Sequence, residues 1–403
     1  MRVAVIGGGA SGLIAAGFCA QNGHAVDLFE VNEKLGKKLF ITGKGRCNVV
    51  NACEPNEVIN NVVNNSKFLY SALNSFTSQD AMAFFENMGV SLKIERGNRV
   101  FPVSDKSSDI IKALERFNKQ NGVNIHLNHK VLSIEKTNGV FNIATNCGVY
   151  NTYDATICCT GGVTYSATGS HGDGYQFAKK FGHSITEVVP GLVPILLNDH
   201  YIKTLEGVSL KNVKLVALHS NKLFKEFFGE MLFTSKGISG PIVLSMSSYI
   251  NRLTNIDLYI DFKPALTYEQ LLRRIERDID ELGNKQVSSL IAGLLPRALI
   301  EPFLEAINIM PTFKAKSLNS KQIQQIALAL KRFDLKYKSV DSLDFGIITS
   351  GGIKVGEINP KTMESKLVKG LYFAGEVLDV DALTGGFNLQ IAFSTGYVAG
   401  TSI

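Results

Sequence analysis

Cysteine is scarce in this chain of 403 residues, and its six cysteines show no pairing pattern. None of them belongs to a C-x-x-C pair, and their density is far below that of a disulfide scaffold. No histidine lies near Cys47 in the sequence, so a small buried thiol is a better interpretation of it than a nucleophile. We expect reduced thiols, no structural zinc site and a cytoplasmic location. The cysteines are Cys19, Cys47, Cys53, Cys147, Cys158 and Cys159.

Long apolar runs are also missing. No stretch reaches the eighteen or so apolar residues of a membrane-spanning helix, and the first residues enter an apolar strand without the residue order of a signal peptide. The sequence is nevertheless 45% hydrophobic, which is enough to bury a large core. We expect a soluble protein of two or three domains that does not contact a membrane.

Neither sign of charge dominates, and no set of catalytic side chains stands out. The net charge is +6, and only the segment 34–46 forms a local basic cluster. Charge alone therefore gives no reason to expect a nucleic acid partner. The sequence has no Ser-His-Asp set, metal cluster or pair of acids at informative spacing, so we expect no metal and a reaction carried by an organic cofactor.

A dinucleotide-binding fingerprint occupies the first thirty residues. An apolar strand over residues 2–6 leads into a G-x-G-x-x-G turn and a helix over 13–20. The three glycines have separate roles, because Gly7 allows the tight turn, Gly9 lets the backbone approach a pyrophosphate and Gly12 lets the helix pack against the strand. Free N–H groups at the start of the helix can receive the phosphates.

An acidic residue completes the fingerprint. A second apolar strand over residues 25–29 ends at Glu30, eighteen residues after Gly12. Its carboxylate can accept hydrogen bonds from both hydroxyls of an adenosine ribose and would repel a 2′-phosphate. The pattern predicts a Rossmann-like α/β domain and leaves open which dinucleotide binds.

The segment after the fingerprint is also rich in glycine. Residues 31–51 combine Gly43 and Gly45 with the guanidinium of Arg46 and the amide of Asn48. Such a loop can wrap closely around a charged, planar ligand. A solvated basic loop is the alternative.

A second glycine-initiated helix is predicted at the end of the chain. An apolar strand over residues 370–376 is followed by a glycine pair and a helix over 389–400. N–H groups near Gly386, Asn388 and Leu389 would favour negative charge on a reduced flavin ring. Because two halves of one site would then be separated by an insertion, FAD is a better interpretation than NAD.

Residues 52–130 are predicted to elaborate the same domain, which continues to residue 188. His126 and His129 stand three positions apart on a predicted strand and should point to opposite faces, so no metal site is expected there. An apolar strand ending near Gly161 would bring the chain back under the dinucleotide. His171 lies in the next glycine-rich loop, where a solvent-exposed turn histidine is the alternative to a role in proton transfer. The other predicted elements are helices over 68–76, 81–88 and 110–117, a parallel strand over 123–127 and a hairpin over 131–136 and 141–145. The helix over 81–88 is expected to begin at Thr77 or Ser78, and the hairpin to turn at Asn138 and Gly139.

A change in composition near residues 188–194 marks an insertion. Short β-like runs extend from there to about residue 262, interrupted by a functional-looking loop over 233–242, and the pattern then becomes helical. One predicted helix, over 321–330, follows a cap at Asn319 and Ser320. The predicted domains are a discontinuous FAD-binding domain of residues 1–188 and 348–403, an inserted β domain of residues 189–266 and 333–347, and a helical lid of residues 267–332.

Five motifs together resemble one known family. They are GGGASG with Glu30, GKGRCN at 43–48, TGSHGDGY at 168–175, GISGP at 237–241 and GLYFAGEVLDVDALTGGFNLQIAFSTGYVAG at 370–400. Over its whole length the chain resembles the BaiN-like, aminoacetone-oxidase-related FAD-dependent oxidoreductases. The resemblance implies an α/β FAD-binding domain with β-barrel-like and helical insertions, and noncovalent FAD in an extended pose. The fingerprint and the resemblance together imply cofactor contacts at Gly7, Gly9, Ala10, Ser11, Gly12, Glu30, Lys38, Gly45, Arg46, Cys47, Asn48, Val131, Gly161, Gly375, Glu376, Asp379, Gly386, Asn388 and Leu389.

The resemblance also implies an activity. We expect hydride transfer between FAD and a small organic substrate, by amine oxidation or enone reduction. The alternative is a flavoprotein that acts on a macromolecule such as tRNA, or a redox-sensing interaction module, with the basic cluster at 34–46 as its contact surface. Only one fingerprint is present, so NADH or NADPH would serve only as a transient electron donor. Arg46 is expected to favour hydride arrival at the flavin, and His171 to donate the proton. The oligomeric state stays open.

Overall fold

A five-stranded parallel sheet forms the centre of the first part of the chain. Its strand order is β20-β10-β1-β2-β6, and every neighbouring pair is parallel. The central strand β1 is apolar and almost wholly buried, as expected for the middle of a parallel sheet. The predicted Rossmann-like α/β fold is confirmed. The strands are β1 (Arg2–Ile6), β2 (Ala25–Phe29), β6 (Asn124–His126), β10 (Ala155–Cys158) and β20 (Leu371–Phe373).

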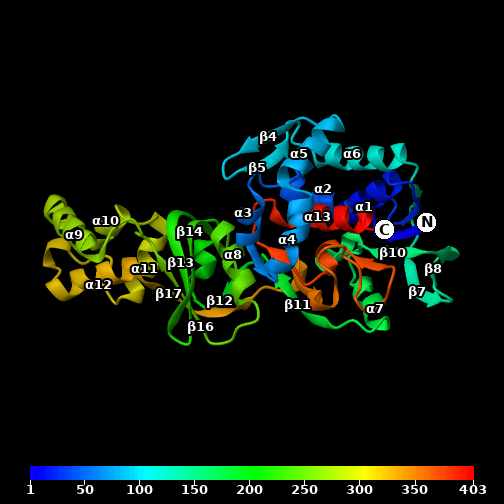
Figure 1. Ribbon diagram of the computed structural model, residues 1–403. Coiled ribbons are helices and arrows are strands. Elements are labelled where there is room, and N and C mark those ends of the chain that lie inside the picture. The colour runs from blue at the N-terminus through cyan, green and yellow to red at the C-terminus, as the bar shows by residue number, and fades with distance from the viewer. The chain divides into compact units, whose positions relative to one another are not determined.

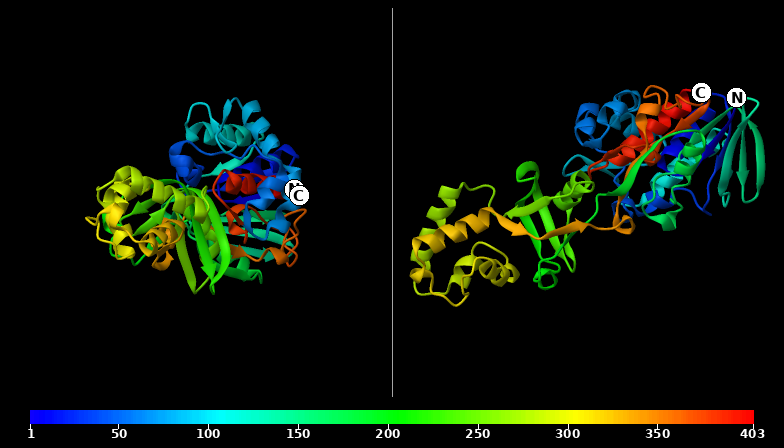
Figure 2. Two further views of the ribbon diagram at one scale, coloured as in Figure 1. Left: turned by 90° about the vertical axis from the view of Figure 1, so that its left-hand side faces the viewer. Right: turned by 90° about the horizontal axis from the view of Figure 1, so that it is seen from below.

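The computed structural model describes all residues 1–403, which form two compact units. The first unit holds residues 1–191 and 343–403, and the second holds residues 192–342 (Figures 1 and 2). Both ends of the chain lie side by side in the first unit, where a ring nitrogen of His24 lies 3.1 Å from the carbonyl oxygen of Ile403. The predicted division into three domains stays a prediction.

Two helices at opposite ends of the sequence, α1 (Ala10–Gln21) and α13 (Phe387–Thr401), pack against each other. A Cβ atom added to Gly396 would collide with the carbonyl oxygen of Ser11, and one added to Gly400 would collide with that of Ala15. The two backbones are therefore in direct contact, and neither glycine position can accommodate a side chain. This contact fixes the dinucleotide helix against the end of the chain.

The remaining elements of the first unit surround this pair of helices and the sheet. The helix over 81–88 was predicted to begin at Thr77 or Ser78, and a capping box between Thr77 and Asp80 starts it there. The predicted hairpin is confirmed, with its turn at Asn138 and Gly139, both in left-handed conformations. The helices are α2 (Lys37–Ile41), α3 (Pro55–Asn60), α4 (Tyr70–Ser75), α5 (Ser78–Asn87), α6 (Ser107–Gln120) and α7 (Asp173–Lys180). The small antiparallel sheets are β3 (Val62–Asn64) with β21 (Asp381–Ala382), β4 (Leu92–Glu95) with β5 (Arg99–Pro102), β11 (Ile185–Gly191) with β19 (Ile348–Ile353), and β7 (Val131–Thr137), β8 (Val140–Thr145) and β9 (Gly148–Tyr153).

The two histidines near β6 do not point to opposite faces, so that prediction is wrong. Strand β6 ends at His126, and Asn128 then takes a left-handed conformation, so the alternation of a strand does not extend to His129. The two imidazole rings lie 5.2 Å apart. They bind polar neighbours, His126 the carboxylate of Asp27 and His129 the hydroxyl of Tyr150. No group of three or more His, Cys, Asp or Glu side chains in the structure is arranged to hold a metal ion.

The second unit combines a seven-stranded antiparallel sheet with helices. The segment 233–242, predicted as a functional loop, is instead the end of one strand, a tight turn, the short strand β15 and the start of helix α8, which the sequence analysis missed. The strands, in sheet order, are β17 (Phe333–Leu335), β16 (Ile256–Asp261), β13 (Ser209–His219), β14 (Lys222–Thr234), β15 (Gly237–Ser239), β12 (Ile195–Leu197) and β18 (Tyr337–Val340).

The helical part of the second unit lies between strands β16 and β17 in the sequence. A capping box at Thr267 starts its first helix, and another at Asn319, the predicted cap, starts its last. None of the helices of the protein is both long and apolar enough to cross a membrane. The helices of this unit are α8 (Pro241–Ile250), α9 (Tyr268–Leu282), α10 (Val287–Ala292), α11 (Ile300–Ala306) and α12 (Ser320–Lys331).

Replacing Gly396 by alanine tests the contact between α1 and α13. The added methyl group would force two backbones apart, so we expect Gly396→Ala to lower the free energy of unfolding by about 1–3 kcal/mol despite the better helix propensity of alanine. Urea denaturation followed by circular dichroism measures the change. Gly356→Ala is the matched control, because a Cβ atom there meets nothing within 4 Å, and it should shift stability by less than about 1 kcal/mol. Equal stability of the two variants would contradict the contact.

Candidate functional site

The glycine turn between β1 and α1 has the geometry that its three roles require. Gly7 has a φ of +104°, and a Cβ atom on it would lie 2.5 Å from the carbonyl oxygen of Cys159. A Cβ atom on Gly12 would collide with the carbonyl oxygen of Gly7, so helix and strand approach as closely as backbone allows. Gly9, by contrast, faces open space, because a Cβ atom added there would meet nothing within 4 Å. The turn therefore leaves room for a ligand beside the start of α1, and only there.

The start of α1 carries no group that competes for its N–H dipoles. Gly9 is the N-cap, no side chain caps the helix, and its first turn contains no acidic residue. Ser11 is buried and donates its hydroxyl hydrogen to the carbonyl oxygen of Ala374, 3.4 Å away. Gly375 has a φ of +79° and lies directly against the side chain of Ser11. The predicted residues Ala10, Ser11 and Gly375 thus lie together at a positive helix end.

Glu30 is buried and fixed to this turn. One carboxylate oxygen accepts a hydrogen bond of 2.7 Å from the N–H of Gly8, and the other accepts bonds from the backbone and side-chain nitrogens of Asn32. Burial raises the pKa of Glu30, while these N–H groups act in the opposite direction. Val131, another predicted contact, is buried at the start of β7, and the backbone N–H of the nearby His129 donates to the carbonyl oxygen of Glu30.

The loop that contains His171 lies next to Glu30. The side chain of Asn32 donates to the carbonyl oxygen of Thr168 at 2.9 Å, and a Cβ atom on Gly169 would press against Asn32. His171 follows two residues later and is exposed. The loop of His171 is therefore fixed beside Asn32, two residues after the predicted ribose contact Glu30. The proton-donor role of His171 stays a prediction.

The predicted loop around Arg46 is tightly folded. Gly43, Lys44, Gly45 and Cys47 all have left-handed backbone conformations, which are costly for the two residues that carry a side chain. Cys47 is fully buried, and burial raises the pKa of its thiol to about 12. The interpretation of Cys47 as a buried thiol rather than a nucleophile is confirmed.

The guanidinium of Arg46 is already paired. It forms ion pairs with Glu95 and Asp105, and it lies 4.1 Å from the centre of the Phe101 ring. Lys93 binds Asp105 at 2.7 Å and completes a cluster of alternating charges. The positive charge of Arg46 is therefore compensated within the protein. An electrostatic role towards a flavin stays a prediction, but Arg46 clearly fastens its loop to the β4–β5 hairpin.

The loop around Arg46 meets the start of α13. A Cβ atom on Gly386, whose φ is +99°, would collide with the backbone of Val50, and the side chain of Asn51 donates to the carbonyl oxygen of Gly385 at 3.0 Å. Gly386 is the N-cap of α13, which has no side-chain cap and no acid in its first turn. These distant segments are therefore neighbours at a second positive helix end. That they form one cofactor site stays a prediction.

The other predicted contacts near α13 differ in whether their side chains already bind another part of the protein. The side chain of Asn388 already binds the backbone of Ala382. It accepts a hydrogen bond of 2.9 Å from the N–H of Ala382 and donates one of 2.7 Å to its carbonyl oxygen. Asp379 is buried and Leu389 half-buried. Gly161 has a φ of +71°, which suits the turn after β10. These residues shape the site mainly through the backbone.

Lys38 and Glu376 form an ion pair that the sequence analysis did not predict. The ammonium group of Lys38 lies 2.7 and 2.9 Å from the two carboxylate oxygens of Glu376, and it donates to the hydroxyl of Thr164 at 2.8 Å. Glu376 also accepts a bond of 2.7 Å from the N–H of Thr349. Both threonines were missed, because nothing in the sequence connects positions 164 and 349. The pair joins the N-terminal and C-terminal halves of the site.

The site keeps buried polar atoms that lack a partner within the protein. They are Oδ1 of Asn48, Oγ1 of Thr160 and the hydroxyl of Tyr175, whose pKa is raised by burial. Thr160 follows β10 beside the glycine turn, and Tyr175 lies on α7. Buried polar groups normally find a partner, so these atoms, the open space at Gly9 and two uncapped helix starts fit a bound dinucleotide.

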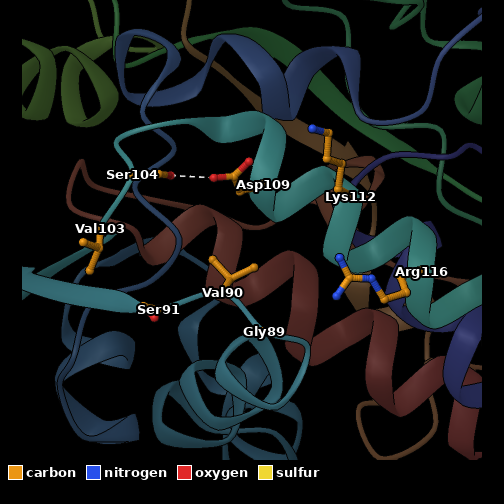
Figure 3. Close-up of a pocket in the computed structure, with 8 residues that line it drawn as sticks. All are labelled: Gly89, Val90, Ser91, Val103, Ser104, Asp109, Lys112 and Arg116. Atoms are coloured by element: carbon orange, nitrogen blue, oxygen red, sulfur yellow. Dashed lines mark hydrogen bonds between the residues drawn. The ribbon is translucent and has the colours of Figure 1, made fainter.

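A surface pocket of about 370 Å³ lies apart from these residues, beside α5 and α6 (Figure 3). Its charged groups are largely engaged, since Ser104 donates to Asp109 at 2.6 Å and Arg116 donates to the carbonyl oxygen of Met88 at 2.9 Å. It contains none of the predicted site residues and is not part of the candidate site.

Comparisons with known proteins agree with this arrangement. The family model described as HI0933-like protein Rossmann domain matches residues 1–402. The chain is 31% identical to the 3-dehydro-bile acid delta(4,6)-reductase of Clostridium scindens, over 99% of this chain and 98% of that protein. It is 29% identical to the ribosomal RNA dihydrouridine synthase of Escherichia coli, over 98% of this chain and 95% of that protein.

Solved structures show a similar fold. The 3-ketosteroid-delta4-(5alpha)-dehydrogenase from Rhodococcus jostii RHA1 is similar with a TM-score of 0.52 and 13% identity, over 99% of this chain and 96% of that chain. The 3-ketosteroid delta1-dehydrogenase from Sterolibacterium denitrificans is similar with a TM-score of 0.50 and 12% identity, over 99% and 98% of the two chains. At this identity the likeness concerns the fold alone.

Replacing Glu30 by alanine tests the adenosine end of the site. The variant loses a charge-assisted hydrogen-bond partner worth about 1.5–3 kcal/mol, so its Kd for FAD should rise by roughly 10- to 150-fold. Fluorescence quenching on titration of apoprotein with FAD measures it. Glu33→Ala is the matched control, because Glu33 is exposed and pairs only with Lys37. If both variants bind FAD like the parent protein, Glu30 is not a cofactor contact.

Proposed function

We propose that this chain, which belongs to the HI0933-like Rossmann-domain family, is an FAD-dependent oxidoreductase that reduces an activated carbon–carbon double bond in a small organic substrate. The observation that carries the proposal is the pair of uncapped helix starts, at Gly9 and Gly386, joined by the close packing of α1 and α13. Two positive helix ends suit a cofactor with a pyrophosphate at one place and a ring that becomes negative on reduction at another.

The names of the relatives support this kind of reaction over amine oxidation. A delta(4,6)-reductase and a dihydrouridine synthase both add hydrogen across a double bond. In such a reduction a hydride adds to the carbon distal to a carbonyl group, a proton adds to the proximal carbon, and the double bond becomes a single bond. FAD, when bound and reduced, would supply the hydride and return to its oxidised form. The residues of this chain orient the reactants and exclude water. The N–H groups at the start of α13 favour the negative charge that the flavin ring carries when it is reduced.

The electron donor, NADH or NADPH, is expected to bind in the same pocket as the organic substrate. A single fingerprint serves the adenosine part of FAD, so NADH or NADPH would have no Rossmann turn of its own. The donor and the organic substrate would then take turns in one pocket. His171 stays the predicted donor of the proton.

A uridine in RNA is a second candidate substrate. The family relative from Escherichia coli is a ribosomal RNA dihydrouridine synthase. The positive charge of this chain is also uneven, because residues 192–342 contain 20 lysines and arginines against 15 acidic residues and so carry most of the net charge of +6. Uracil and a steroid enone share a double bond conjugated to a carbonyl group, so one flavin chemistry would serve both.

Stopped-flow reoxidation of the reduced flavin tests the proposed reaction. We expect anaerobic, dithionite-reduced protein to regain its flavin absorbance near 450 nm on mixing with an enone such as 4-androstene-3,17-dione or cyclohex-2-enone, and oxidised protein to stay oxidised with primary amines. Reduction by an amine without reoxidation by any enone would reverse the assignment. Reoxidation by a uridine oligonucleotide alone would select the second candidate.

A further inference from the structure

Three exposed apolar side chains lie in segments that meet at Thr164, the threonine that binds Lys38 of the Lys38–Glu376 ion pair. Tyr165 is 37% exposed, Phe345 57% and Ile347 37%. We call these three residues the apolar rim. They come from two segments that are about 180 residues apart in the sequence, yet both segments belong to the first unit.

Both segments converge on Thr164. Tyr165 follows it directly, and the ammonium nitrogen of Lys38 lies 2.8 Å from the hydroxyl of Thr164 and 5.8 Å from the centre of the Tyr165 ring. A Cβ atom on Gly346 would lie 3.0 Å from the methyl carbon of Thr164. Phe345 and Ile347 flank this buried glycine, so they stand next to the same threonine.

The ring of Tyr165 is partly exposed, and the backbone of this residue is strained. Its φ is +55°, a left-handed conformation that an aromatic residue seldom adopts. Strain of this kind persists where the surrounding structure imposes it, and it is commonest at binding sites. A single exposed apolar side chain needs no explanation, but three beside one threonine that binds a half-buried ion pair form a surface that an apolar ligand would cover.

We infer that the apolar rim is the wall that binds the body of a rigid, multi-ring, apolar enone. The inference rests on the proposed function and names the substrate class for that site. The carbonyl-bearing ring would lie towards the cofactor, and the remaining rings would lie against Tyr165, Phe345 and Ile347. A phosphate would gain little here, because the one nearby cation, Lys38, is already neutralised by Glu376.

Equilibrium binding tests this without requiring turnover. 4-Androstene-3,17-dione is titrated into the oxidised holoprotein, and the shift of the flavin absorbance gives its Kd. We expect Tyr165→Ser and Phe345→Ser each to raise that Kd by about tenfold or more, because each removes an aromatic contact. Their Kd for cyclohex-2-enone, which is too small to reach the rim, should change by less than about twofold. Without a ligand, the flavin absorbance spectrum of each variant should match that of the parent protein.

Leu367→Ser is the matched control, because Leu367 is an apolar side chain of the first unit that is 52% exposed and lies outside the site. It should bind both probes like the parent protein. Steroid binding that is unaltered in both rim variants would overturn the inference, and so would rim variants that lose affinity for a uridine oligonucleotide but not for the steroid. The proposed function fails separately, if the reduced parent protein is reoxidised by neither enone.

Discussion

The contact between α1 and α13 is the constraint on which the site depends. Helix α1 must approach β1 closely enough for Gly12 to touch the backbone of Gly7, and α13 must approach α1 closely enough for Gly396 and Gly400 to touch its carbonyl groups. Only residues without a side chain permit both approaches. Because the two helices come from opposite ends of the sequence, this contact brings both halves of the cofactor site into one unit, whatever the insertion between them contains.

The charged side chains of the site are largely balanced by one another. Lys38 is paired with Glu376, and Arg46 with Glu95 and Asp105. The unbalanced positive potential that remains comes from the backbone, at the N-terminal ends of α1 and α13. Such dipoles are fixed by the fold and need no reorganisation when charge develops on a ligand. The ion pairs therefore act mainly to hold loops in place, and the proposed role of the helix ends is to bind the anionic parts of the cofactor.

Local patterns predicted local structure well. The strand, turn and helix at the N-terminus, the hairpin turn at Asn138 and the helix start at Asn319 were all visible, because each depends on neighbouring residues. Contacts between distant residues were not visible. Arg46 binds Asp105, and Lys38 binds Glu376, through pairings that no periodicity encodes. The neighbours of His171 could not be foreseen for the same reason, since only the fold shows that its loop lies beside Asn32.

The central claim is that the two helix ends hold one extended FAD molecule. It is tested most directly by releasing the chromophore from purified protein by denaturation and identifying it by liquid chromatography and mass spectrometry. The account predicts FAD, at about one molecule per chain after reconstitution, since Glu30 is placed to bind an adenosine ribose that FMN lacks. Release of FMN, or a protein that stays colourless after incubation with FAD, would contradict it.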